Sequence, residues 1–310
     1  MTVSSHPPIR ILDGHMHLLT AGTAREAAAW RPPASPVVAA AAARRVARYE
    51  REQAIPSAAP QAEEVEAAAT RWLKELDRHR VSAAVFLALA PRPETLRRFA
   101  AIRPDRLLAF TFLDPREPDA PDRLDEDVRR RGFHGLKLYP TIQGFHVWDE
   151  RAYPLYERAE ALGTPILIHF GVTLDYRSDL RYANPLDLHP VARDFPGIPF
   201  VVAHAGAGFF RETLFLAYHC ANVHVDTSGS GTWMAYLPRP MTAHEVLERL
   251  LDVFGADRVI FGSDSRHAAE GYRHWLLSGQ RRILEALQVS EEGQRKVLGA
   301  NMARLLKLAW

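Results

Sequence analysis

Several histidines and one aspartate stand directly after apolar runs, at the places where buried strands would end. The residues that follow these runs are His15 and His17, His169, His204 and Asp264. His15 and His17 are two positions apart, so on an extended strand their side chains lie on the same face and can reach one ion. Imidazole nitrogens and a carboxylate oxygen favour Zn²⁺, with Mn²⁺ or Fe²⁺ as alternatives, and an open coordination position would hold water.

Each of these histidines taken alone is as readily explained as a core residue whose hydrogen bonds are satisfied. Four histidines and an aspartate, each following an apolar run, are much harder to explain in that way. The pattern therefore predicts a divalent metal site. A further run, 134–138, presents Lys137 and Tyr139 at its end, and Lys137 is the only lysine that falls on a predicted strand.

The elements that must position these groups repeat along the chain. Short apolar runs predict strands, which are 9–13, 81–90, 107–112, 134–138, 165–170, 198–204, 222–226 and 258–262. Segments with helical spacing separate them, at 63–80, 93–102, 119–131, 149–162, 186–195, 210–219 and 243–253, and two more follow at 272–287 and 291–307. A strand and a helix together take about 30 residues, the usual length of a βα unit. Eight such units predict an α/β fold, a (β/α)₈ TIM barrel, with a doubly wound open sheet as the competitor.

In such a barrel the carboxyl ends of the strands form one face, which is where catalytic groups lie. We expect residues 1–310 to be a single barrel domain. Residues 20–60, rich in alanine and proline, predict a helical insertion after the first strand, on the active-site side. The insertion would be either a lid over the pocket or an oligomer contact, and the sequence favours neither.

Composition excludes several classes of protein. Of 310 residues, 47% are hydrophobic and 25% charged, which is typical of a globular chain with a large core. The net charge of +2 gives no field that would attract nucleic acid or an anionic membrane, so we expect a small-molecule substrate, with a homo-oligomer left open. One cysteine excludes a disulfide scaffold, and no secretion signal or membrane span is evident, so we expect a cytoplasmic protein.

The combined motifs resemble one known family. His15-Met-His17, His169, His204 and Asp264, in that order, resemble the amidohydrolase superfamily of metal-dependent TIM barrels. The motifs Gly135-Leu-Lys137-Leu-Tyr139, His204-Ala-Gly206 and Phe261-Gly-Ser-Asp264 resemble more particularly its amidohydrolase-related family 2 branch. The resemblance runs from about residue 9 to the segment that begins at Asn301, so it covers nearly the whole chain.

The resemblance implies roles for these residues. His15, His17, His169 and Asp264 would bind one divalent metal, and His204 would stand beside the metal-activated water as a polarising group or as an acid/base. Asp264 would take a proton as the water attacks and pass it to the leaving group.

Three roles are possible for Lys137. In binuclear members of the superfamily a lysine at this place is carboxylated and bridges two metals, whereas the branch that this chain resembles generally uses one. Lys137 would then bind substrate or pair with a carboxylate, or be purely structural. Tyr139, Arg177 and Arg181 are weaker candidates for substrate binding, and the two arginines, which follow His169 closely, would suit an anionic substrate.

The leading hypothesis is a metal-dependent hydrolase of a small-molecule ester, lactone or amide. The alternative is a non-hydrolytic, metal-dependent decarboxylase of an aromatic or unsaturated acid, since the same branch includes such lyases. Some of those decarboxylases carry a glutamate where His15 stands, which favours hydrolysis without deciding it. A third reading is a barrel that only binds metal or a partner. The chain has no Gly-x-Gly-x-x-Gly after its first strand and no Gly-x-Ser-x-Gly, which disfavours nicotinamide enzymes and serine hydrolases.

Overall fold

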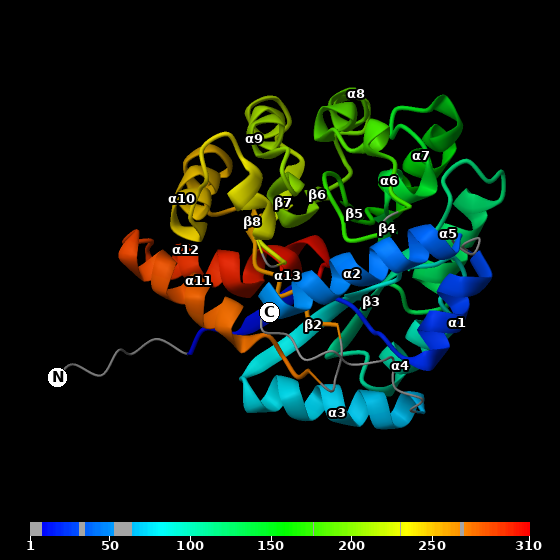
Figure 1. Cartoon of the computed structure of the whole chain (residues 1–310), viewed down its shortest axis with the longest axis horizontal. Helices are drawn as coiled ribbons and strands as arrows, with labels where there is room; N and C mark the ends of the chain where they lie inside the picture. Colours follow the sequence, from blue (N-terminus) through cyan, green and yellow to red (C-terminus); the bar gives the residue numbers. More distant parts are fainter. Residues whose placement is uncertain (1–7, 31–34, 53–63, 176, 230, 267–269) are drawn as a thin grey trace.

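A computed structural model describes residues 8–30, 35–52, 64–175, 177–229, 231–266 and 270–310. Within these ranges eight parallel strands form one sheet in sequential order, as predicted (Figure 1). They are β1 (Ile11–Met16), β2 (Val81–Leu87), β3 (Leu107–Phe112), β4 (Gly135–Leu138), β5 (Ile166–Ile168), β6 (Phe200–Val202), β7 (Val223–Asp226) and β8 (Val259–Ile260).

Helices connect the strands and cover the outside of the sheet. They are α1 (Ala21–Trp30), α2 (Pro36–Glu52), α3 (Val65–Arg78), α4 (Glu94–Ile102), α5 (Ala120–Arg129), α6 (Pro140–Gln143), α7 (Tyr153–Leu162), α8 (Leu188–Asp194), α9 (Phe210–His219), α10 (Ala243–Phe254), α11 (His274–Ala286), α12 (Glu291–Arg295) and α13 (Asn301–Leu305). The predicted helix over 291–307 is divided, because a π-helical turn, Lys296–Ala300, separates α12 from α13.

The first and last strands meet through backbone hydrogen bonds that nearly close the barrel. The amide of Gly14 donates to the carbonyl of Phe261 over 2.9 Å, and the amide of His17 donates to the carbonyl of Ser265 over 2.8 Å. The amide of Asp264 donates to the carbonyl of His15, also over 2.8 Å. This seam therefore brings together two histidines from one end of the chain and an aspartate from the other.

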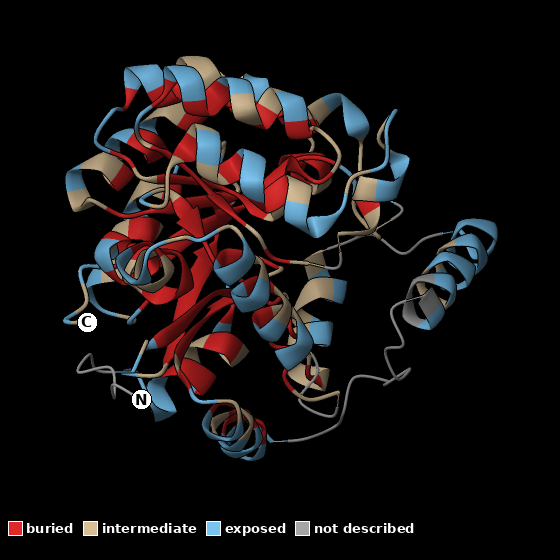
Figure 2. Cartoon of the chain, turned by 90° about the vertical axis from the view of Figure 1, so that its left-hand side faces the viewer, coloured by how far each residue is buried: buried red, intermediate tan, exposed pale blue. Residues whose placement is uncertain are grey.

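The core has two layers because side chains alternate across each strand. On β2, Val81, Ala84 and Phe86 pack outward against helices, and Ala83, Val85 and Leu87 point into the barrel. The same inner layer takes residues from the other strands, including Leu108, Phe110, Leu167, Val201 and Ile260. Figure 2 shows this buried interior. A packed interior fixes the strands, so groups beyond their carboxyl ends are held on a firm base.

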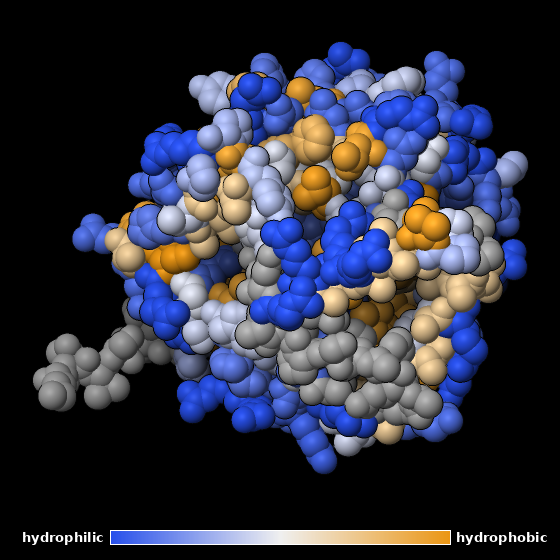
Figure 3. Space-filling model, viewed as in Figure 1, coloured by the Kyte–Doolittle hydropathy of each residue, from blue (hydrophilic) through white to orange (hydrophobic). Residues whose placement is uncertain are grey.

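The predicted insertion contains α1 and α2, and its residues 31–34 and 53–60 lie outside the described ranges. Helix α2 is largely exposed, crosses the molecule in Figure 1, and stands off from the barrel in Figure 2. One of its guanidinium groups, that of Arg45, donates to the carbonyl of Leu174 over 2.7 Å, which ties it to the segment after β5. The face that α2 crosses is mostly hydrophilic, with smaller hydrophobic groups (Figure 3). None of the helices described is both long and apolar enough to cross a bilayer.

Candidate metal centre

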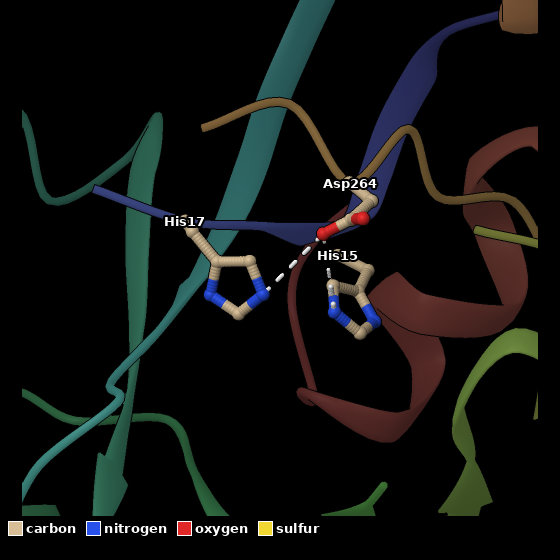
Figure 4. Close-up of side chains that lie close together, drawn as sticks. All are labelled: His15, His17 and Asp264. Atoms are coloured by element: carbon tan, nitrogen blue, oxygen red, sulfur yellow. Dashed lines mark ion pairs between the residues drawn. The ribbon is translucent and has the colours of Figure 1, made fainter. Parts of the chain in front are cut away.

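Three predicted metal ligands meet where the barrel closes. The Nε2 atom of His17 lies 3.4 Å from Oδ1 of Asp264, and Nε2 of His15 lies 4.0 Å from the same oxygen (Figure 4). A tetrahedral ion with bonds of about 2.1 Å holds neighbouring ligand atoms roughly 3.4 Å apart. The observed spacing therefore suits a metal of the Zn²⁺ class.

Hydrogen bonds at the far side of each ring show which nitrogens carry protons. The Nδ1 atom of His17 lies 3.1 Å from the carbonyl oxygen of Leu87, which can only accept, so this nitrogen donates and Nε2 is bare. The Nδ1 atom of His15 lies 2.8 Å from Oδ2 of Asp226, and an ionised carboxylate also only accepts.

The Nε2 atoms of His15 and His17 and a carboxylate oxygen of Asp264 thus face one another. The Nε2 atom of His15 is buried, and no hydrogen-bond partner for it exists in the described part of the chain. Three acceptors at such distances repel one another unless a cation lies between them. The donor set therefore fits a divalent metal.

His169 and His204 stand beside this trio. The ring of His204 is 4.6 Å from that of His15 and 4.8 Å from that of His169, centre to centre. The Nε2 atom of His169 lies 3.3 Å from the carbonyl of Val172, so Nδ1 is its bare nitrogen. Two groups of described residues have ligand atoms within 4.8 Å of one another, His15 with His17 and Asp264, and His15 with His204 and Asp226. His169 belongs to neither, and its role as a ligand stays a prediction.

Strands β2, β5, β6 and β8 end earlier than the sequence predicts, and after two of them the backbone turns sharply. Strand β6 ends at Val202, and His204 lies in the turn that follows, with φ of 54°. Strand β8 ends at Ile260, and Asp264 also has φ of 54°. Residues other than glycine rarely adopt this left-handed conformation, at a cost of about 1–2 kcal/mol each. Such strain is concentrated at functional sites, and here it re-aims two side chains of the candidate centre.

Asp226 and Ser228 are functional candidates that the sequence interpretation missed. Oδ1 of Asp226 accepts from the backbone amides of His204, over 2.9 Å, and Ser228, over 3.0 Å, and from the Ser228 hydroxyl. That hydroxyl lies 2.8 Å from Nδ1 of His204, and the Ser228 carbonyl lies 3.1 Å from the same nitrogen. Nδ1 of His204 is therefore the protonated nitrogen, and Nε2 is bare. Asp226 ends an apolar strand just as the predicted ligands do, so the same signal could have found it.

Burial and neighbouring charges set the protonation of the site. Burial lowers the pKa of His17 to about 3, that of His204 to about 4, and that of His169 well below its usual value. Burial opposes ionisation of Asp264, but His17, His204 and Arg273 hold its pKa below the ordinary value. The Nη1 atom of the buried Arg273 lies 3.7 Å from Oδ2 of Asp264. Neutral imidazoles and an ionised carboxylate are the forms that bind a metal.

A cavity of about 530 Å³ opens beside the trio, large enough for a small organic molecule. Its lining includes the site residues His17, Lys137, Tyr139, His169, His204, Ser228 and Asp264. Arg45 and Arg48 of α2 also line it. The described part of the insertion therefore contributes to the cavity wall.

The two remaining candidates lie elsewhere. Arg177 binds Asp175 over 3.0 Å, Arg181 binds Asp179 over 2.5 Å, and neither is among the described residues that line the cavity. Each guanidinium group is engaged by a carboxylate two residues before it, which keeps it in a local turn.

Lys137 is 1% exposed, and no hydrogen-bond partner for its Nζ exists in the described part of the chain. Burial lowers its pKa to about 7, against the attraction of Asp226 and Asp264. The ring of Tyr139 lies 4.2 Å from that of His169, centre to centre, at a tilt of 35°, and its hydroxyl donates to the Thr173 hydroxyl over 2.5 Å.

Comparisons with known proteins agree with this architecture. A zinc-bound amidohydrolase of Burkholderia multivorans superposes with a TM-score of 0.68 at 16% identity, over 97% of this chain and 100% of that one. A probable 2-pyrone-4,6-dicarboxylic acid hydrolase of Acinetobacter baumannii gives 0.65 at 14% identity, over 96% and 100%. A manganese-bound 5-carboxyvanillate decarboxylase of Novosphingobium aromaticivorans gives 0.62 at 14% identity, over 96% of both chains.

Among curated sequences, a dihydroorotase of Yersinia enterocolitica is 32% identical over 169 residues, which are 46% of this chain and 48% of that protein. The chain spans about half the length of the curated relatives it matches. The amidohydrolase family model, in contrast, matches residues 12–308. The solved neighbours include both hydrolases and decarboxylases, and some hold zinc or manganese. This chain belongs to the amidohydrolase family, as its motifs predicted.

Proposed function

We propose that this chain is a metal-dependent hydrolase that opens an ester, lactone or amide bond of a small molecule. The observation that carries the proposal is the convergence of three acceptor atoms, from His15, His17 and Asp264, beside a cavity. His15, His17 and Asp264 would hold the metal, with His169 as the predicted fourth ligand. When bound, the metal supplies a Lewis acid that makes water acidic enough to be deprotonated near neutral pH.

Side chains of this protein would then accept and transfer the proton released by the water. His204 lines the cavity with a bare Nε2, so it is suited to accept a proton rather than to donate a hydrogen bond to a carbonyl. This favours its acid/base role over the polarising role. Asp264 has one oxygen toward the histidines and one toward Arg273, so it can bind the metal and hold a proton in transit to the leaving group.

A decarboxylase of an aromatic or unsaturated acid is the second candidate. Solved neighbours named 5-carboxyvanillate decarboxylase share the fold with TM-scores of 0.61 to 0.63. The presence of His15, at a position where some such decarboxylases carry glutamate, favours hydrolysis.

The test begins with chelated protein, reloaded separately with Zn²⁺ and Mn²⁺. Hydrolysis of esters, lactones and amides is measured beside carbon dioxide release from aromatic and unsaturated acids. We expect turnover that is lost on chelation and restored by metal, with the circular dichroism spectrum unchanged. His169→Ala and Asp264→Ala should lose metal and activity, and His244→Ala, on the exposed face of α10, should lose neither. Carbon dioxide release without hydrolysis would support the second candidate, and no turnover with metal loaded would contradict both.

The insertion 20–60 follows the first strand and is predicted to be either a lid or an oligomer contact. We infer that its helix α2 covers the cavity, because Arg45 and Arg48 line the cavity and Arg45 donates a hydrogen bond to the segment after β5. Its deletion should broaden substrate selectivity. Unchanged selectivity with a changed oligomeric state would favour the oligomer contact.

A further inference from the structure

Lys137 is a buried amino group that makes no hydrogen bond to an anion in the described part of the chain. It lies in β4, is 1% exposed and lines the cavity, and its Nζ has no hydrogen-bond partner among the described residues. The ring of Tyr139 lies 5.4 Å from Nζ. Removing an ammonium group from water is costly unless an anion or several acceptors replace the water. A bound ligand in the cavity could supply the hydrogen-bond acceptor that the Nζ atom of Lys137 lacks.

The two nearby carboxylates are occupied by other groups. Both oxygens of Asp226 accept hydrogen bonds, Oδ2 from His15 and Oδ1 from His204 and Ser228. Asp264 turns one oxygen to the histidines and the other toward Arg273. Arg273 and Lys137 already place positive charge near these two carboxylates, so a divalent cation at the trio would add further positive charge to the site. Such a site attracts an anion.

The rest of the cavity agrees with an anionic ligand. Its lining includes Arg45, Arg48 and Arg266 in addition to Lys137. The acidic residues of the lining are Asp264 and Asp175, and Asp175 is paired with Arg177. The remaining walls are largely apolar, with Leu89, Val172, Leu174, Ala207 and Trp233. An anionic group attached to an apolar or ring-shaped body fits this combination.

We propose that Lys137 Nζ binds a carboxylate of the substrate, so that the natural substrates are small carboxylic acids with an apolar or ring body. An ammonium group binds a carboxylate through a charge-assisted hydrogen bond. Phosphate sites add several backbone amides to such a cation. In the adjoining loop the amide of Ser228 already donates to Asp226. The proposal rests on the proposed function in that it takes this cavity as the active site.

The test uses benzoate and benzamide, which share size and ring and differ in charge. Their dissociation constants for the metal-loaded protein are measured by calorimetry. We expect benzoate to bind at least about 10-fold more tightly, as a charge-assisted hydrogen bond allows. In Lys137→Met the preference should fall below about 3-fold, with metal content unchanged. Lys74→Met, on the exposed face of α3, should keep the full preference.

The variant is decisive because the metal alone could favour an anion. Preference for benzoate that persists in Lys137→Met, or equal binding of both ligands by the wild type, would overturn the proposal. Lys137→Gln, which keeps a polar side chain, is measured in parallel in case the methionine variant folds poorly. Loss of metal in both variants, with a lysine carbamate visible by ¹³C NMR after equilibration with labelled bicarbonate, would also overturn it, because Lys137 would then be a bridging ligand.

Binding is read without turnover, so the two proposals can fail separately. If the protein hydrolyses neutral lactones but shows no preference for benzoate, the proposed function is supported and the carboxylate site is contradicted. If the protein prefers benzoate through Lys137 but hydrolyses none of the substrates, the carboxylate site is supported and the hydrolase function is contradicted.

Discussion

The Nδ1 atom of His15 lies 2.8 Å from Oδ2 of Asp226, and both side chains are fully buried. Because the carboxylate accepts a hydrogen bond from Nδ1 of His15, the ring is oriented with its Nε2 atom toward Asp264. Through Oδ1 the same carboxylate holds the backbone of His204 and the hydroxyl of Ser228. One residue of β7 thus orients two histidines, one on β1 and one in the turn after β6.

Asp226→Asn should weaken metal binding by about 10–100-fold, because the amide no longer fixes the orientation and basicity of His15. Metal affinity is measured by competition with a chromophoric chelator, and folding by circular dichroism. Asp252→Asn, on the exposed face of α10, is the matched control and should bind metal like the wild type. Unchanged affinity in Asp226→Asn would contradict this positioning role.

Ser228→Ala should separate metal binding from proton transfer. It removes the hydroxyl between Asp226 and His204 but leaves the bond between Asp226 and His15 in place. Metal content should therefore stay at the wild-type level, while kcat falls about 10-fold or more through the loss of proton transfer by His204. A parallel loss of metal would show that Ser228 supports the ligands instead.

Gly262→Ala should disturb the candidate metal centre because the added methyl group would clash with neighbouring side chains. A Cβ atom at this position would lie 2.8 Å from the Cβ atoms of both His15 and Ser228, so both contacts must be relieved by a shift of the surrounding chain. We expect lower metal occupancy and a loss of stability of about 1–3 kcal/mol, measured by denaturant titration. Gly279→Ala, in α11, meets no atom within 4 Å and should be neutral, or stabilising by up to about 1 kcal/mol. Equal behaviour of the two variants would refute the explanation by close contact.

His224, inside the barrel on β7, should make the fold sensitive to acid. Burial lowers its pKa to about 4, below the ordinary 6.5, so the native state binds its proton less readily than the unfolded state. Its contribution to stability is complete above pH 6.5 and is lost as pH falls toward 4. Between pH 7 and 5 the loss amounts to about 2 kcal/mol.

His224→Gln should therefore lose less stability than the wild type over this interval, as measured by denaturant unfolding of the metal-free protein at both pH values. His244→Gln, whose side chain is exposed, should keep the wild-type dependence on pH. A wild-type dependence in His224→Gln would assign the acid sensitivity to the other buried histidines.

Much of the fold could be predicted from the sequence because its signals are local. Apolar runs such as 107–112 became buried strands, here Leu107–Phe112, since their composition suits burial on both faces of a parallel sheet. Parallel strands end on one face of a barrel, so polar residues after the runs had to gather there. That reasoning alone placed His15, His17 and Asp264 together.

What the tertiary structure decided are pairings between distant segments and turns of the backbone. His15 and Asp226 are 211 positions apart, and no local pattern says which buried carboxylate will meet which histidine. The arginines show the same limit, because Arg177 and Arg181 turned to nearby carboxylates while Arg45 and Arg48 of α2 reached the cavity. Sequence spacing sets which face of a strand a residue occupies. Hydrogen bonds and charge across the barrel, which depend on the closed fold, decide what that residue touches.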